Sequence, residues 1–395
     1  MAAKGVSLSQ SALDRLTLGA PSLAIEELGQ VAGLEPGRPL RLLDPHGEVV
    51  ATGVADPENG VVHIFARQAV RGLDAGFFRE RVEAALALRK ALGLVDGVSA
   101  YRLINGEGDG LPGLWVDVYG KFAVLSAAAG GLLPLARLLA EAVRAATGAA
   151  GVVLKVRGKD PQDRSLKDEV FGETPPQKLV VEELGVPYEV HLLGSLNVGL
   201  FCDMREHRRG IRRFVEGRRV LNTFAYTGAL SVASARAGAT AVTSVDLSGG
   251  VLAWARENFR LSGFNLDDPR WRFEVSDVRR FMEKQQRAGE TYDAIILDPP
   301  TVSAARASQW SMKKDYPDLI ALATRLLPRE GGFLWVSANT RKGPDVLRHV
   351  QEGCKRAARP AAVLELGGLP PDFPTPADWP ESRYLEVCQL HVGPL

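Results

Sequence analysis

Cysteine is scarce in this sequence, and long apolar runs are absent. The three cysteines, Cys202, Cys354 and Cys388, are too few and too far apart for a disulfide framework or a clustered metal site. No stretch of about 18 apolar residues occurs, and the N-terminus lacks the continuous apolar core of a secretory signal. We therefore expect a cytoplasmic protein with no metal and no membrane partner.

The sequence also lacks an excess of charge of one sign. Its 48 Lys and Arg residues balance 47 Asp and Glu residues, which gives a formal net charge of +1. This balance argues against a protein that binds nucleic acid over a broad basic surface. Any contact with nucleic acid therefore needs a local patch of basic residues. A length of 395 residues exceeds what one core usually holds and predicts two or three domains.

Three patterns follow one another along the chain. Residues 1–70 carry short alternating segments separated by turn signals, which is typical of a small all-β domain. Residues 71–190 begin with a helix capped by Asp74 and continue as an α+β middle domain. Residues 191–395 alternate buried strands with helices, which predicts an α/β doubly wound parallel sheet. A Pro-rich loop too short for a helical crossover joins the final two strands, so the last strand should pair antiparallel.

Acidic residues end three successive predicted strands of this last domain. Asp246, Asp277 and Asp298 each follow a buried strand, and ligands of doubly wound sheets bind beyond those strand ends. The turn after the first strand reads NTFAYTG, in which Gly228 lets the backbone approach a ligand. It is not GxGxxG, so a dinucleotide is disfavoured. One such Asp could simply cap a helix, but the ordered set suits an adenosine compound without phosphates, of which S-adenosylmethionine is the common one.

Arginines are concentrated just before this domain's first strand. Seven of them lie between Arg205 and Arg219, several at helical spacing. One interpretation is a solvated helix face. The other assigns the methionine carboxylate to Arg205 and RNA phosphates to the remaining arginines.

The motifs GLFCDMR, LNTFAYTG, SVDLS, ILDPP and YLEVCQL make the chain resemble a known family. It is similar to the class I S-adenosylmethionine-dependent methyltransferases that modify bases of large-subunit (23S) ribosomal RNA. The resemblance covers nearly the whole chain and implies a Rossmann-like methyltransferase sheet and a PUA-like N-terminal domain. It implies ribosomal RNA or its assembly intermediates as partner, and a homodimer is a further expectation. The expected cofactor-binding residues are Asp203, Arg205, Asn222, Phe224, Tyr226, Thr227, Gly228, Asp246, Leu247, Ser276, Asp277 and Asp298. The expected RNA contacts are Arg208, Arg209, Arg212, Arg341 and Lys342.

The target atom depends on one position after the fifth strand. Asp298, Pro299 and Pro300 are expected to form the catalytic floor between cofactor and base. Cytosine-C5 members of the family need a cysteine nucleophile in a Ser-Cys-Ser-like motif, and the matching position here is Ala338. Guanine-N7 members look closer to this chain, and N7 needs only proximity because it carries an in-plane lone pair.

A guanine nitrogen is therefore the favoured target, and three alternatives stay open. They are a cytosine-C5 enzyme, a small-molecule methyltransferase and a catalytically silent RNA-binding protein. Methylation of an exocyclic amine is disfavoured because Thr301, after the two prolines, is not an aromatic that could stack the base.

Overall fold

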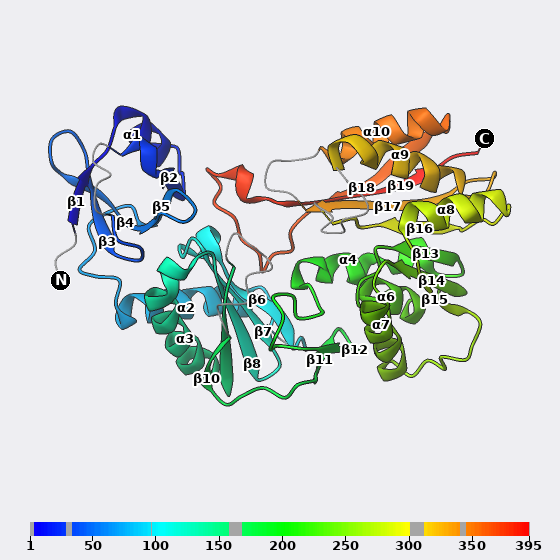
Figure 1. Cartoon of the computed structure of the whole chain (residues 1–395), viewed down its shortest axis with the longest axis horizontal. Helices are drawn as coiled ribbons and strands as arrows, with labels where there is room; N and C mark the ends of the chain where they lie inside the picture. Colours follow the sequence, from blue (N-terminus) through cyan, green and yellow to red (C-terminus); the bar gives the residue numbers. More distant parts are fainter. Residues whose placement is uncertain are drawn as a thin grey trace. The chain divides into compact units, whose positions relative to one another are not determined.

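A computed structural model of the chain describes residues 4–28, 34–95, 97–157, 168–300, 312–339 and 345–394. Thr301, Arg341 and Lys342 lie outside these residues. The chain folds into two compact units (Figure 1). The first unit comprises Met1–Glu182, Val190–Val198 and Pro371–Ser382, and the second comprises Glu183–Glu189, Gly199–Pro370 and Arg383–Leu395. The division into three domains at residues 70 and 190 stays a prediction.

The N-terminal sheet of the first unit has the strand order β1-β3-β4-β5-β2. Its elements are β1 (Lys4–Ser7), α1 (Gln10–Thr17), β2 (Ser22–Ala24), β3 (Pro39–Leu43), β4 (Val49–Asp56) and β5 (Val61–Ala66). The alternating segments of the sequence form β3, β4 and β5, which pair antiparallel with one another in that order. The sequence did not reveal β1, α1 and β2; the two strands, of four and three residues, are too short to show an alternating pattern.

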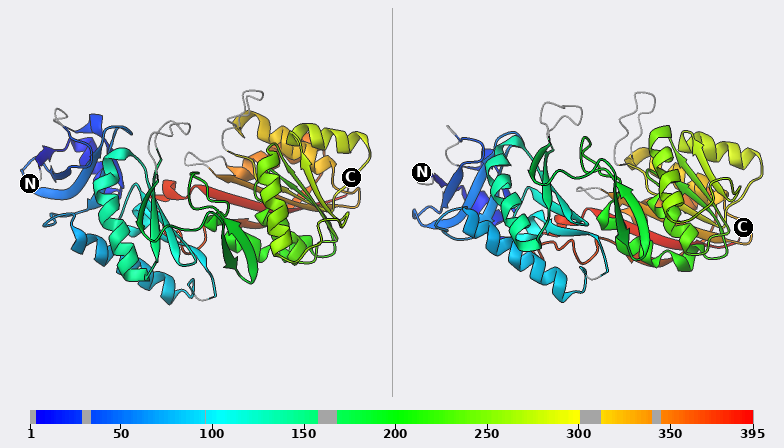
Figure 2. Two further views of the ribbon diagram at one scale, coloured as in Figure 1. Left: turned by 60° about the horizontal axis from the view of Figure 1, so that its bottom comes forward. Right: turned by 90° about the horizontal axis from the view of Figure 1, so that it is seen from below.

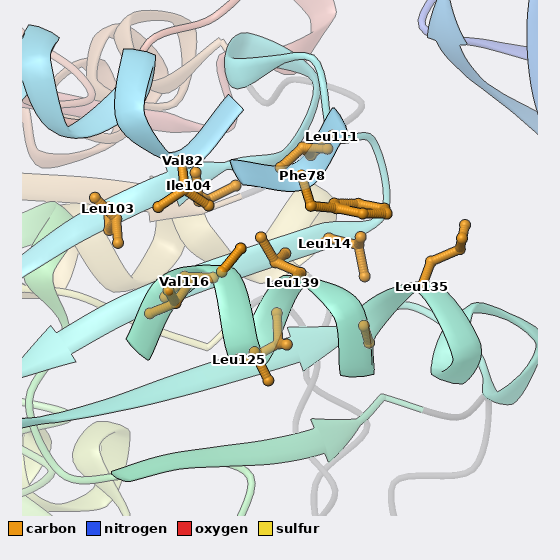
Figure 3. Close-up of a cluster of buried hydrophobic side chains, with 14 of the residues drawn as sticks. Phe78, Val82, Leu103, Ile104, Leu111, Leu114, Val116, Leu125, Leu135 and Leu139 are labelled. Carbon is orange, nitrogen blue, oxygen red and sulfur yellow. The ribbon is translucent and has the colours of Figure 1, made fainter. Parts of the chain in front are cut away.

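The second sheet of the first unit has the order β10-β9-β8-β7-β6. Its elements are α2 (Ala75–Ala91), β6 (Ala100–Asn105), β7 (Leu114–Tyr119), β8 (Phe122–Ala127), α3 (Leu133–Thr147), β9 (Gly151–Val156) and β10 (Glu169–Gly172). Phe78 of α2 and Leu139 of α3 pack with strand residues such as Val116 in one buried cluster (Figure 3). Asp74 caps α2 as predicted, since its carboxylate accepts the Phe77 backbone N–H at 3.0 Å. The short edge strand β10 was not predicted.

Polar contacts hold the distant segment Pro371–Ser382 within the first unit. The Arg102 backbone N–H donates to Asp372 Oδ2 at 2.9 Å, and the Arg89 guanidinium donates to the Asp372 carbonyl at 2.8 Å. Asn105 Nδ2 donates to the Pro374 carbonyl at 2.9 Å. Because the first unit is built from stretches far apart in the sequence, chain order alone does not predict which residues belong to it.

A separate two-stranded sheet is formed by β11 (Leu179–Glu183) and β12 (Val186–Val190).

The second unit is a three-layer α/β structure around a seven-stranded sheet of order β15-β14-β13-β16-β17-β19-β18. Its strands are β13 (Arg219–Thr223), β14 (Ala241–Asp246), β15 (Trp271–Val275), β16 (Ala294–Leu297), β17 (Gly332–Asn339), β18 (Ala361–Gly367) and β19 (Leu385–Val392). Its helices are α4 (Arg205–Gly210), α5 (Arg212–Val215), α6 (Ala229–Arg236), α7 (Gly249–Leu261), α8 (Val278–Arg287), α9 (Met312–Arg325) and α10 (Val346–Ala357). Helices α6 and α7 cover one face and α8, α9 and α10 the other, as Figures 1 and 2 show.

This arrangement confirms the predicted fold class. Strands β13 to β17 run parallel, while β19 pairs antiparallel with both β17 and β18. Thr223 of β13 aligns with Val245 of β14 and with Leu297 of β16. The residues that follow these three strands therefore emerge at the same edge of the sheet, beside β13, where the strand order reverses. None of the helices that the structure describes is long and apolar enough to cross a bilayer.

Candidate functional site

The turn after β13 has an unusual backbone. Phe224, Tyr226 and Gly228 have φ values of 54°, 49° and 74°, in the left-handed region that residues with a Cβ rarely adopt. A Cβ at Gly228 would lie 2.7 Å from the Ala255 side chain, so only glycine fits where α6 begins. Such conformations persist only where the surroundings impose them, and they cluster at ligand sites. We call residues 224–228 the cofactor turn.

Asp246 links this turn to the next helix. One carboxylate oxygen accepts the Tyr226 backbone N–H at 2.9 Å, and the other accepts the Ser248 backbone N–H at 3.0 Å. Each oxygen of an ionised carboxylate can accept a further hydrogen bond. Asp246 can therefore anchor the turn and still accept the two hydroxyls of a ribose.

Two apolar side chains are exposed at the same edge of the sheet. Leu247 is 58% exposed and Val275 is 62% exposed, and Val275 pairs in register with Asp246. The Ser276 hydroxyl donates to the Asp277 carbonyl at 3.0 Å, while the Asp277 carboxylate caps α8 by accepting the Arg280 backbone N–H at 3.0 Å. Asp277 thus has the helix-capping role that the sequence left open. The exposed apolar pair suits a flat ring.

Asp298 lies where β16 and β17 end side by side. The Ser337 hydroxyl donates to Asp298 Oδ1. The buried Tyr316 hydroxyl lies 2.6 Å from the Ser337 carbonyl and 3.2 Å from the Leu297 carbonyl, which ties the two strand ends together. Burial raises the pKa of Asp298 to about 6; the Ser337 hydrogen bond opposes this rise, and the nearby Asp203 carboxylate adds to it. Pro299 is buried, and Pro300 is exposed.

A second acidic residue approaches from the segment before β13. Asp203 is buried and accepts a hydrogen bond from the Tyr384 hydroxyl at 3.0 Å. Arg205 is also buried, and its Nε lies 3.3 Å from Glu206 Oε1. Phe201 is 45% exposed, and its ring lies against Tyr226 with centroids 5.5 Å apart.

Two further residues expected to bind the cofactor are buried within the second unit. Thr227 is buried, and its hydroxyl donates to the Gly199 carbonyl at 2.5 Å. Asn222 is buried against α6, where its Nδ2 donates to Ser231 Oγ at 2.8 Å. Its Oδ1 accepts no hydrogen bond within the described part of the chain. Asn222 therefore lies inside the second unit and keeps one open acceptor.

Sequence reasoning missed three residues at this edge. Ser337, Tyr384 and Phe201 all stand in or beside the motifs noted above, but none carried a role there. A hydroxyl or ring in a strand-like segment is usually packing, so the sequence signal was weak. Their roles follow from contacts that only the folded chain makes.

The structure removes Arg208 from the expected RNA contacts. Its side chain is 4% exposed and donates to both oxygens of Glu183, at 2.7 and 2.6 Å. A buried, doubly bonded guanidinium has no free face for a phosphate. Arg209 and Arg212 are 66% and 70% exposed, and they pair with Glu206 and Glu216 at 3.4 and 2.5 Å. Such exposed pairs are weak, so both guanidinium groups stay accessible.

Thiol chemistry finds little support here. The three cysteines are all buried within the described residues. Burial raises the pKa of Cys388 to about 11, so its thiol is neutral at physiological pH. Ala338 is buried in the main hydrophobic cluster of this unit.

Known proteins resemble this chain in sequence and in fold. A family model described as S-adenosylmethionine-dependent methyltransferase matches residues 133–380. Ribosomal RNA large subunit methyltransferase I of Cronobacter sakazakii is 31% identical over 374 residues, covering 92% of this chain and 94% of that protein. The protein of the same name from Escherichia coli is 30% identical with the same coverage, 92% and 94%. A candidate methyltransferase solved in complex with SAH is 26% identical with a TM-score of 0.87, covering 99% of this chain and 100% of that one.

Proposed function

This chain belongs to the S-adenosylmethionine-dependent methyltransferase family, and we propose that it methylates a guanine nitrogen, of the N7 type, in large-subunit ribosomal RNA. Family membership makes it an enzyme whose cofactor is S-adenosylmethionine. The substrate class follows the relatives that share more than nine-tenths of its length. The choice of atom rests on one observation, Ala338, which stands where cytosine-C5 members carry their nucleophile.

The side chains at the sheet edge fit S-adenosylmethionine. Asp246 has acceptor capacity left for the ribose hydroxyls, and the exposed Leu247 and Val275 provide an apolar surface for adenine. Gly228 has no Cβ, which lets α6 begin close against Ala255 of α7 directly after the turn. Asp203 and Arg205 suit the amino-acid part of the cofactor. The negative charge of Asp203 can pair with the cofactor's amine, and the positive charge of Arg205 can pair with its carboxylate. The remaining residues expected to bind the cofactor stay predictions.

A ring nitrogen needs little chemical help from this protein. When bound, S-adenosylmethionine supplies a methyl group that is already electrophilic. A guanine nitrogen attacks with a lone pair in the ring plane, so catalysis reduces to holding the base edge at the methyl group. The ionised Asp298 carboxylate can accept N–H bonds from the base, and Ser337 fixes that carboxylate. Pro299 and Pro300 add a rigid floor because their φ angles are fixed.

Cytosine-C5 methylation would instead require a thiolate to add to the ring. The pKa of Cys388 and the burial of Cys202 and Cys354 all disfavour one. RNA as the substrate is supported by the exposed arginines Arg209 and Arg212. A PUA-like N-terminal domain, a homodimer and a cytoplasmic location stay predictions.

Transfer of labelled methyl groups tests the substrate class. The protein is incubated with labelled S-adenosylmethionine and unmodified transcripts of large-subunit or small-subunit ribosomal RNA, with Asp298→Asn as a control for contaminating activity. We expect label in large-subunit RNA with the native protein alone. Cofactor binding without label in any RNA would favour a small-molecule methyltransferase. Absence of cofactor binding would favour a catalytically silent RNA-binding protein.

A further inference from the structure

We propose that Asn258 is a positioning residue for the cofactor turn, acting through the carbonyl of Thr227. The proposal rests on the proposed function, because it takes the turn to be part of the S-adenosylmethionine site. Asn258 lies on α7 and is 1% exposed, so it acts through protein groups.

Both ends of the Asn258 amide are engaged. Its Nδ2 donates to the Thr227 carbonyl at 2.8 Å, and its Oδ1 accepts the Glu189 backbone N–H at 2.8 Å. The reversed amide would set N–H against N–H and oxygen against oxygen, so the orientation is fixed by these partners. One side chain therefore joins the cofactor turn to β12.

The neighbouring turn of α7 completes the arrangement. Trp254 precedes Asn258 by four residues, and its Nε1–H donates to the Glu189 carbonyl at 3.0 Å. A Cβ at Gly199 would lie 2.2 Å from the Trp254 ring, so the chain passes directly over that ring. The Gly199 carbonyl in turn accepts the Thr227 hydroxyl at 2.5 Å. One face of α7 thus holds β12, the segment at Gly199 and the cofactor turn together.

The backbone of the turn explains why such support matters. Phe224 and Tyr226 carry side chains yet have positive φ, which is unfavourable unless contacts impose it. The bond from the Tyr226 N–H to Asp246 fixes the middle of the turn, and the bond from Asn258 to Thr227 fixes the residue before Gly228. Loss of the second bond should let the turn relax and shift the Tyr226 N–H that donates to the Asp246 carboxylate. Cofactor binding should then fall, whereas the transfer step at Asp298 should not.

Two substitutions separate the two bonds. Asn258→Leu removes both, while Asn258→Asp keeps an acceptor for the Glu189 N–H but, when ionised, cannot donate to the Thr227 carbonyl. We expect both variants to bind S-adenosylhomocysteine about tenfold more weakly in calorimetry, because both leave the buried Thr227 carbonyl without its donor. The KM for S-adenosylmethionine should rise similarly, with kcat at saturating cofactor largely retained.

Phe259→Leu is the matched control for a general loss of stability. Phe259 is fully buried on α7 and packs against Trp271 and Phe273, with centroids 5.7 and 5.1 Å away. This variant should lower Tm without weakening cofactor binding. The proposal is overturned if Asn258→Asp, measured at a pH at which its carboxyl is ionised, binds as tightly as the native protein, or if Phe259→Leu loses as much affinity at an equal loss of Tm. If Asn258→Leu does not fold, Asn258→Asp still decides the question. A native protein that binds no S-adenosylhomocysteine would instead refute the proposed function.

Discussion

Replacement of Asp298 by asparagine should stabilise the protein at neutral pH while abolishing methyl transfer. Burial raises the pKa of this carboxyl from 3.8 to about 6. A raised pKa means that the folded state binds the proton more tightly than the unfolded state. Below about pH 4 the carboxyl is protonated in both states, so it carries no penalty. Stability is then lost as the pH rises from about 4 to about 6, and above that range the whole penalty is present.

The magnitude follows from the size of this pKa change. A difference of about two pH units at about 1.36 kcal/mol per unit corresponds to roughly 3 kcal/mol at pH 7.5. Asparagine is close to aspartate in size and carries no charge, so Asp298→Asn should gain up to that amount at pH 7.5 and nothing near pH 3.5. Urea unfolding followed by tryptophan fluorescence at several pH values measures the difference. A gain that does not change with pH, or a variant less stable than the native protein at pH 7.5, would show that burial of the Asp298 carboxylate does not destabilise the fold.

Asp345→Asn provides the matched control for this substitution. Asp345 caps α10 by accepting the Arg348 backbone N–H at 3.0 Å, and asparagine caps helices about equally well. Its free energy of unfolding should therefore stay within about 0.5 kcal/mol of the native value at each pH. If only the Asp298 variant gains stability, the native carboxylate at the sheet edge lowers the free energy of unfolding, as is common for functional residues.

Three further predictions concern cofactor, proton and RNA. Asp246→Ala should weaken S-adenosylhomocysteine binding by at least about 1 kcal/mol, because ribose hydroxyls lose their acceptor; an unchanged Kd in calorimetry would remove Asp246 from the site. The pH profile of kcat/KM should show an acid limb near the pKa of Asp298, about 6, and Ser337→Ala should move that limb upward, since the Ser337 hydrogen bond lowers this pKa. If the acid limb of the variant's profile lies at the native pH, the Ser337 hydrogen bond does not affect the pKa of Asp298. Arg209→Gln and Arg212→Gln should each weaken RNA binding and reduce its salt dependence by about one unit of slope, and unaltered slopes would show that neither residue contacts a phosphate.

The fold could be predicted largely from local pattern. Buried strands alternating with helices predicted the class of the second unit, and the Pro-rich loop before β19 predicted that the last strand pairs antiparallel. The acids at the strand ends were placed correctly because parallel strands bring their carboxyl ends to one edge. The precise role of each acid was not readable, since Asp277 caps a helix while Asp298 is bound by Ser337.

Contacts between distant parts of the chain account for what the sequence did not reveal. The partner of Arg208 is Glu183, which lies 25 residues earlier at the end of β11, so the charge run alone suggested a free guanidinium. The Tyr384 hydroxyl reaches Asp203 across 181 residues. In the sequence, Asn258 is one polar residue on an amphipathic helix. Its hydrogen bonds to Thr227 and Glu189 form only in the folded chain. Such pairings are set by tertiary packing, which overrides local pattern.

The identity of the methylated nucleoside decides whether the enzyme modifies a guanine nitrogen or a cytosine carbon. Large-subunit ribosomal RNA methylated by the native protein is digested to nucleosides and analysed by mass spectrometry against authentic standards. We expect 7-methylguanosine, because Ala338 leaves the sheet edge without the cysteine that ring-carbon methylation needs. A 5-methylcytidine product would contradict it.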